Sequence, residues 1–123
     1  MKIAVDARTV YTSHRRGTGK NLVDLYRRLA AMRPQWQFVM FHRNAGVDDP
    51  FAELPNVAAK CIEIRGDRYD LWEQVRLPLA ALRAGANVLH CPANTAPCLS
   101  SVPLVVSIHD LIAFEPISRL TVM

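Results

Sequence analysis

The 123-residue sequence lacks several features that mark particular classes of protein. No apolar run approaches the roughly 20 residues that a membrane-spanning helix needs. Asp6 interrupts the first apolar run after three residues, so the N-terminus does not have the pattern of a signal peptide. Cysteine occurs only at Cys61, Cys91 and Cys98, without a CxxC pair. We therefore expect a reduced, cytoplasmic chain with buried or inert thiols.

The phosphate-binding fingerprints of nucleotide enzymes are also missing. After Lys20, where a P-loop has Ser or Thr, the chain has Asn21. A dinucleotide GxGxxG motif would place Gly at position 22, and Leu22 stands there. Aromatic residues make up only 7% of the chain and no nucleic-acid recognition motif is present. Although the net charge is +4, we expect no nucleic-acid partner.

The residues that are present have the balance of one globular domain. Half are hydrophobic and 21% are charged. A chain of this length is enough for one domain and can bury roughly two thirds of its unfolded surface. No internal repeat is visible.

Apolar runs alternate with helical patterns along the chain. The runs predict strands at residues 2–6, 37–42, 57–64, 88–90 and 104–108. A first helix is expected from Thr18, as its N-cap, to Pro34, with Leu22, Leu25, Tyr26 and Leu29 facing inward. A second is expected over 69–84, kinked or divided at Pro78 and ended by Gly85, with this inner face: Leu71, Trp72, Val75, Leu79 and Leu82.

This order, β-α-β-β-α-β-β, predicts an α/β fold. Strands that are apolar throughout indicate a mostly parallel, Rossmann-like sheet with helices on both faces. The segment 118–123 offers the start of a further element and then stops, so the sheet is expected to be incomplete. An incomplete sheet leaves an exposed edge or apolar face, from which we predict self-association.

Ligands of open parallel sheets bind outside the carboxyl ends of the strands. The predicted strands bring Asp6 and Arg8, His42, His90, and His109 with Asp110 to that edge, with His14 in the loop above and Asn94 opening the loop after the fourth strand. Asp6 and Asp110 are candidates for acid–base work or, alternatively, for orienting neighbours. A zinc site is not expected, since the spacing of His90, Cys91, Cys98 and His109 matches no ligand pattern.

Two basic features leave alternatives open. The loop Gly17-Thr18-Gly19-Lys20 opens the first helix and could place backbone amides against a phosphate, or be a flexible solvated loop. From Arg15 to Arg33 there are six basic residues and one acid. This face is either simply solvated or a surface for anionic lipid or a phosphorylated acceptor, which would place the protein peripherally at the inner face of the membrane.

Four motifs, in order, resemble glycosyltransferase family 4 enzymes of the GT-B fold. The first combines Met1–Arg8 with Arg16–Asn21 and the amphipathic helix. The others are Leu71-Trp72-Glu73-Gln74 with Leu77-Pro78, Asn87–Ala93 with Pro97, and Val105–Leu111 with Pro116. Together they span nearly the whole chain.

The resemblance implies a retaining transfer of a mannose-like sugar from a nucleotide-sugar to a hydroxyl acceptor in glycan or polysaccharide synthesis, without a cofactor or metal. Residues 1–123 would be the N-terminal, acceptor-side domain, apparently truncated and lacking the C-terminal donor domain. The resemblance places Gly17–Lys20 at the donor diphosphate and His109, beside Asp110, at the donor sugar. The end of the first strand (Asp6 and Arg8), His90 and Asn94 would line the acceptor cleft, where the glycan or lipid-linked acceptor binds.

The chain departs from the family pattern in the glycine loop. Thr18 and Lys20 stand where the family usually has an aliphatic residue and an arginine, so the positive charge stays but the planar fork is lost. Without a donor domain, we expect the isolated chain to be inactive. The alternative hypothesis is a free-standing, non-catalytic binding or assembly domain with the same fold.

Overall fold

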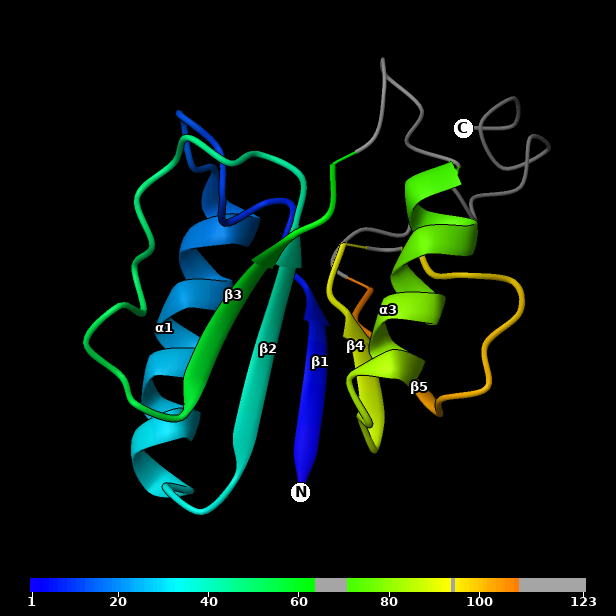
Figure 1. The fold of residues 1–123 in the computed structure, drawn as a ribbon. Coiled ribbons are helices and arrows are strands. Elements are labelled where there is room, and N and C mark those ends of the chain that lie inside the picture. The colour runs from blue at the N-terminus through cyan, green and yellow to red at the C-terminus, as the bar shows by residue number, and fades with distance from the viewer. Residues whose placement is uncertain (64–70, 94, 109–123) are drawn as a thin grey trace, which may run out of the picture.

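A computed structural model describes residues 1–63, 71–93 and 95–108. Within these ranges five strands form one all-parallel sheet in the order β3-β2-β1-β4-β5 (Figure 1). The strands are β1 (Lys2–Asp6), β2 (Gln37–His42), β3 (Val57–Cys61), β4 (Val88–Cys91) and β5 (Leu104–Val106). The α/β, Rossmann-like fold expected from the sequence is therefore confirmed.

Helices cover both faces of this sheet, which explains why β1 and β2 are apolar almost throughout. The helix α1 (Gly17–Met32) packs on one face through Leu22, Tyr26 and Ala30. A π-helical segment, η1 (Trp72–Arg76), continues into α3 (Leu77–Arg83) on the other face. Each layer has its own core, and Figure 1 shows α1 and α3 on opposite sides of the strands.

The predicted inner face of the second helix is confirmed at Trp72 but wrong at Val75, Leu79 and Leu82. Val75, Leu79 and Leu82 are 49%, 38% and 50% exposed, whereas Trp72 and Leu77 are fully buried. The five-residue step between those two buried side chains is the hydrogen-bond spacing of a π-helix, since the Leu77 N–H donates to the carbonyl of Trp72, and it turns the following α-helix relative to the expected 3.6-residue pattern. Of the predicted span, Tyr69 and Asp70 lie outside the described residues. The prediction of a divided helix ended by Gly85, which has φ +73°, is confirmed.

The first helix also differs from its prediction in detail. It begins at Gly17, with Arg16 as N-cap and no capping hydrogen bond from a side chain, so Thr18 is not the cap. Leu25 is 49% exposed, although Leu22 and Tyr26 beside it on the predicted inner face are buried. The first turn of α1 thus presents its backbone amides without a side-chain partner.

Three strands end at residues other than the predicted ones. The third and fifth strands end at Cys61 and Val106, earlier than predicted, and the fourth extends to Cys91. The loop 44–56 carries the fully buried Phe51, and this loop packs on the α1 side of the sheet where a helix between β2 and β3 would lie. The predicted strand residue Ile64 and the segment 118–123 lie outside the described residues.

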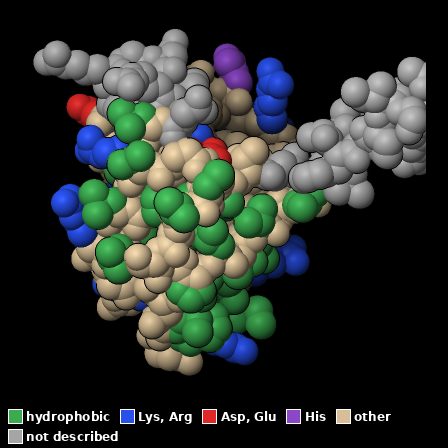
Figure 2. All heavy atoms as spheres, turned by 90° about the vertical axis from the view of Figure 1, so that its right-hand side faces the viewer, with side chains coloured by type: hydrophobic (Ala, Val, Ile, Leu, Met, Phe, Trp, Pro, Cys, Tyr) green, Lys and Arg blue, Asp and Glu red, His purple; other side chains and the backbone are tan. Residues whose placement is uncertain are grey.

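One lateral side of the molecule is apolar and open. All three residues of β5 are exposed, and so are Val75 on η1 and Leu79 and Leu82 on α3. Figure 2 shows hydrophobic side chains gathered on this side of the molecule. A hollow of about 450 Å³ lies here between the outer side of α3 and the segment 99–101. Among the described residues no strand pairs with the outer edge of β5.

In the described part of the chain, no helix combines the length and the apolar character that crossing a membrane requires.

Candidate functional site

The strand order reverses between β1 and β4, which makes this point the topological switch of the sheet. Successive strands run outward from β1 to β3 on one side, and β4 and β5 lie on the other. In open α/β sheets the ligand crevice opens outside the carboxyl ends of the strands at such a point. The residues that follow β1 and β4, together with the first turn of α1, are therefore the candidate site.

At the end of β1, Asp6 and Arg8 form a tight ion pair. The Arg8 guanidinium donates to both carboxylate oxygens of Asp6, with Nε–Oδ1 3.0 Å and Nη2–Oδ2 2.7 Å. Its Nη2 also donates to Glu73 Oε2 at 2.7 Å, which ties β1 to the segment η1. The Asp6 and Glu73 side chains are only 3% and 13% exposed, so this is a largely buried charge cluster.

The surroundings of Arg8 fix its position and its charge. Its guanidinium lies 4.7 Å from the centre of the Trp72 ring, a cation–π arrangement. Burial lowers the pKa of Arg8, but hydrogen bonding and the negative charges of Asp6 and Glu73 outweigh burial and raise it above its ordinary value. Because Asp6 is already engaged by Arg8, its arrangement fits orientation better than proton transfer.

Glu73 and Gln74 hold the loop that follows β4. Glu73 accepts from Thr95 Oγ1 at 3.0 Å. Gln74 donates to the carbonyl of Ala96 at 3.1 Å and accepts from the backbone N–H of Cys98 at 2.7 Å. These bonds fasten the segment after β4 to the helical layer.

On the opposite face of the sheet, His90 joins two hydroxyl groups. Its Nδ1 shares a hydrogen bond of 2.5 Å with the Tyr26 hydroxyl, and its Nε2 shares one of 2.7 Å with Ser107 Oγ. Burial, together with the nearby Cys91, raises the pKa of Tyr26 and keeps its phenol neutral. The result is a hydrogen-bonded chain from α1 through the end of β4 to the residue that follows β5.

A small cavity of about 60 Å³ lies beside this chain. It is lined by His90 and Ser107, by Thr18 and Asn21 at the start of α1, and by the apolar side chains of Leu22, Leu25 and Pro92. Its volume accommodates one or two water molecules or a small polar group of a ligand. The cavity therefore brings together two of the predicted site elements, the glycine loop and His90.

The predicted site residues consequently divide between two faces of the sheet. Val5 pairs with His90 in the register of β1 and β4, so His90 shares a face with Val5 and not with Asp6. The Asp6–Arg8 pair lies on the α3 side and His90 lies on the α1 side. Both groups lie at the carboxyl edge of the sheet, on opposite faces.

Gly19 has a different role from the one that the sequence suggested. A Cβ at this position would overlap the backbone carbonyl oxygen of Thr9 and come within 2.7 Å of Arg15 Cγ. The close approach thus brings α1 against the loop that follows β1, within the protein itself. Gly17, by contrast, has no atom within 4 Å of such a Cβ.

His42, the predicted site residue at the end of β2, belongs to a separate packed group. Its ring stacks on Tyr11 with centroids 4.0 Å apart, and Tyr11 donates to Asp49 at 2.8 Å. Burial lowers the pKa of His42, against the smaller raising effects of Asp49 and the Asn44 N–H. His42 therefore stays neutral in the fold to a lower pH than it does in the unfolded chain.

This shift predicts a loss of stability in acid. As the pH falls below about 6.5 the unfolded state takes up the His42 proton first, so unfolding becomes more favourable by up to about 1.4 kcal/mol per pH unit until the folded state also titrates. His42→Gln is expected to flatten the decline between pH 7 and pH 5, measured by urea unfolding. Parallel curves for the two proteins would show that His42 does not contribute.

The three cysteines are free, and they differ in environment. Cys91 is fully buried, and burial with the charges of Asp6 and Glu73 raises its pKa to about 12, whereas Cys61 and Cys98 are exposed. In the part of the chain that the structure describes, no three His, Cys, Asp or Glu side chains are arranged to hold a metal ion.

These environments predict two reactive thiols out of three. Under native conditions Cys61 and Cys98 should react with a thiol reagent, and Cys91 should react only when the chain unfolds, because its thiol is buried and protonated. Mass spectrometry after brief labelling tests this. Rapid labelling of Cys91 would mean that the end of β4 opens readily.

Three predicted site residues, Asn94, His109 and Asp110, lie outside the described residues. His14 is exposed in the loop before α1. Tyr26 and Ser107 were not predicted as partners of His90. A tyrosine on a buried helix face was the available signal, since its hydroxyl requires a polar partner.

Comparison with known proteins identifies no relative of this chain. No protein-family model matches it, and neither the curated proteins nor the solved structures contain a significant match.

Proposed function

We propose that this chain is the acceptor-side part of a retaining glycosyltransferase that uses a nucleotide-sugar donor and a hydroxyl acceptor. One observation carries the proposal: at the switch point the uncapped first turn of α1 meets His90 and Ser107 around one small cavity. Among the described residues, the motifs that resemble glycosyltransferase family 4 include the ends of β1 and β4 and the first turn of α1. The mannose-like donor and the glycan or polysaccharide acceptor rest on that resemblance.

The first turn of α1 suits a leaving diphosphate. Transfer of the sugar develops negative charge on the departing phosphate, and helix N-terminal amides stabilise such charge. The first turn contains no acidic residue, and Lys20 is exposed beside it. In this proposal Gly17 and Thr18 supply amides and Lys20 supplies a cation.

The cavity suits a hydroxyl group of the acceptor. The Ser107 hydroxyl, which is hydrogen-bonded to His90 Nε2, has remaining hydrogen-bonding capacity for it, and Leu22, Leu25 and Pro92 add apolar walls. Tyr26 fixes the His90 ring from behind. Arg8 keeps Asp6 and Glu73 in place across the edge and so holds the acceptor side rigid.

Calorimetric titration with GDP-mannose and UDP-glucose tests the proposal. It should compare the 123-residue chain with a longer reading frame that contains it. We expect the longer protein to bind or hydrolyse a donor, Lys20→Ala to weaken that binding, and the 123-residue chain not to bind. Tight donor binding by the short chain would contradict the expectation that a separate donor domain binds the nucleotide-sugar. Absence of binding by both proteins would overturn the proposed activity.

The open apolar side favours a second candidate, a non-catalytic assembly domain. Three exposed aliphatic residues of β5 and the outer side of α3 offer an edge strand and a surface for another copy. Light scattering after size exclusion should then show self-association that Leu104→Lys with Val106→Lys abolishes. A stable monomer at high concentration would count against this candidate and leave the first.

A further inference from the structure

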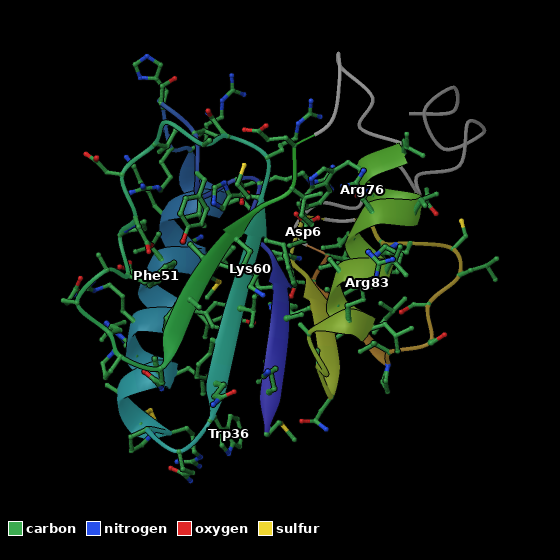
Figure 3. The ribbon with its side chains drawn as sticks, viewed as in Figure 1. Asp6, Trp36, Phe51, Lys60, Arg76 and Arg83 are labelled. Carbon is green, nitrogen blue, oxygen red and sulfur yellow. The ribbon has the colours of Figure 1, made fainter. Side chains whose placement is uncertain are left out.

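A groove with basic walls runs between β3 and α3, away from the switch point. Lys60 on β3 and Arg76 and Arg83 on the helical layer all line one hollow of about 250 Å³. Lys60 and Arg83 also line an adjoining hollow of about 470 Å³, which extends toward the start of β2. Figure 3 shows Lys60 on the strand side and the two arginines on the helix side of this groove.

The groove forms because α3 leaves part of the sheet uncovered. The buried residues of α3 pack over β1, β2 and β4, and the face of β3 that carries Ala58 and Lys60 remains exposed. Exposed small and basic side chains on a strand, opposite exposed basic side chains on a helix, leave a concave channel with charged walls.

The three cationic groups have no anionic partner in the described part of the chain. No hydrogen bond or ion pair engages the side chain of Lys60, Arg76 or Arg83, and no acidic side chain lines either hollow. Other basic side chains are engaged: Arg8 pairs with Asp6, and Arg27 pairs with Glu53. Like charges that share one groove repel each other unless an anion lies between them.

The floor of the groove adds an apolar component. Phe41, Ile62, Leu79 and Ala80 line the same hollow as the three cations. Leu79 is 38% exposed, so apolar surface is accessible to a ligand there. A concave site with few cations above an apolar floor fits a small molecule better than a flat membrane surface.

We propose that this groove binds a small phosphate ester, whose phosphate lies between Lys60, Arg76 and Arg83 and whose apolar body rests on Ile62 and Leu79. Arginine binds phosphate through two parallel hydrogen bonds, and lysine adds a point charge. This site differs from the proposed donor site at Gly17–Lys20, because it lies on the α3 side of the sheet and α1 packs on the other side.

Two-dimensional NMR titration with phenyl phosphate, inorganic phosphate and phenol tests the proposal residue by residue. We expect phenyl phosphate to shift the amides of Lys60, Ile62, Arg76 and Arg83 and to bind more tightly than inorganic phosphate, with no shift from phenol. The triple variant Lys60→Gln, Arg76→Gln, Arg83→Gln should weaken binding at least about tenfold, because each lost charge-assisted contact is a substantial part of the affinity.

A matched control removes the same charge from the other layer. The control is the triple variant Arg27→Gln, Arg28→Gln, Arg33→Gln. These three arginines lie on α1 or at its end, outside both hollows. The control variant should leave phenyl phosphate binding unchanged at fixed ionic strength. The proposal is overturned by equal weakening in both variants, by shifts confined to Gly17–Lys20, or by no binding. It is also overturned if the chain binds phosphatidylglycerol vesicles but not phenyl phosphate.

Discussion

Gly19→Ala is expected to destabilise the chain by about 2–3 kcal/mol, the range of a severe steric insertion into a packed site. The new Cβ would meet the carbonyl oxygen of Thr9 and lie 2.7 Å from Arg15 Cγ. The Thr9 contact is the costly one, since backbone cannot move aside as the end of a side chain can. Either α1 or the loop after β1 must shift. Urea unfolding followed by circular dichroism measures the change.

Gly17→Ala is the matched control for this prediction. It lies two residues earlier in the same helix and has open space around a Cβ. Replacing glycine by alanine in a helix usually stabilises it slightly, because the unfolded chain loses freedom. We therefore expect Gly17→Ala to be neutral or mildly stabilising. Similar losses for both variants would mean that helix entry, and not the Thr9 contact, sets the cost.

The two glycines thus have different roles in the loop. Gly19 lets α1 approach the loop that follows β1, and that approach places the first turn at the sheet edge. The amides proposed to face a phosphate belong to Gly17 and Thr18. Gly19→Ala should then weaken the proposed donor binding through displacement of α1, and the loss should accompany the loss of stability.

Much of the sheet could be predicted because its signals are local. The apolar runs of β1 and β2 coincide with the observed strands, since both are buried on two faces and flanked by polar residues. The short strands are less well predicted at their ends. In β3 only Val57 is buried, so apolar character there does not mark where pairing stops.

The second helix could not be predicted in register from the sequence. A π-helical turn inserts one extra residue between Trp72 and Leu77, and no rule of hydrophobic periodicity signals such an insertion. Every residue after it faces a different direction from the expected one. Pro78 marked the break correctly, because proline is tolerated in the first turn of a helix.

The predicted strand ends placed the right residues at one edge of the sheet. The sequence did not predict on which face of the sheet each side chain lies. Asp6 and His90 were expected together, and the β1–β4 register puts them on opposite faces. Their true partners are distant in sequence: Glu73 lies 65 residues from Arg8, and Tyr26 lies 64 residues from His90. Such pairs follow from tertiary packing, which single-sequence patterns do not encode.

Arg8→Met is the second large effect that we expect. Removing one partner of a buried ion pair costs about 3–5 kcal/mol, because the remaining charges stay buried without compensation. Here two carboxylates, of Asp6 and Glu73, would lose their shared cation, and Trp72 would lose its cation–π contact. A cost of this size is a large fraction of the stability of a small domain. Chemical unfolding, with NMR spectra to verify folding, measures it.

Arg27→Met provides the comparison for an exposed pair. Arg27 and Glu53 are 43% and 55% exposed, so water replaces the lost partner and little measurable change is expected. A third variant separates charge from packing: adding Asp6→Asn and Glu73→Gln to Arg8→Met removes the uncompensated charges and should restore part of the stability. If it restores none, the packing of Arg8 against Trp72 stabilises the end of β1, and the ion pair does not.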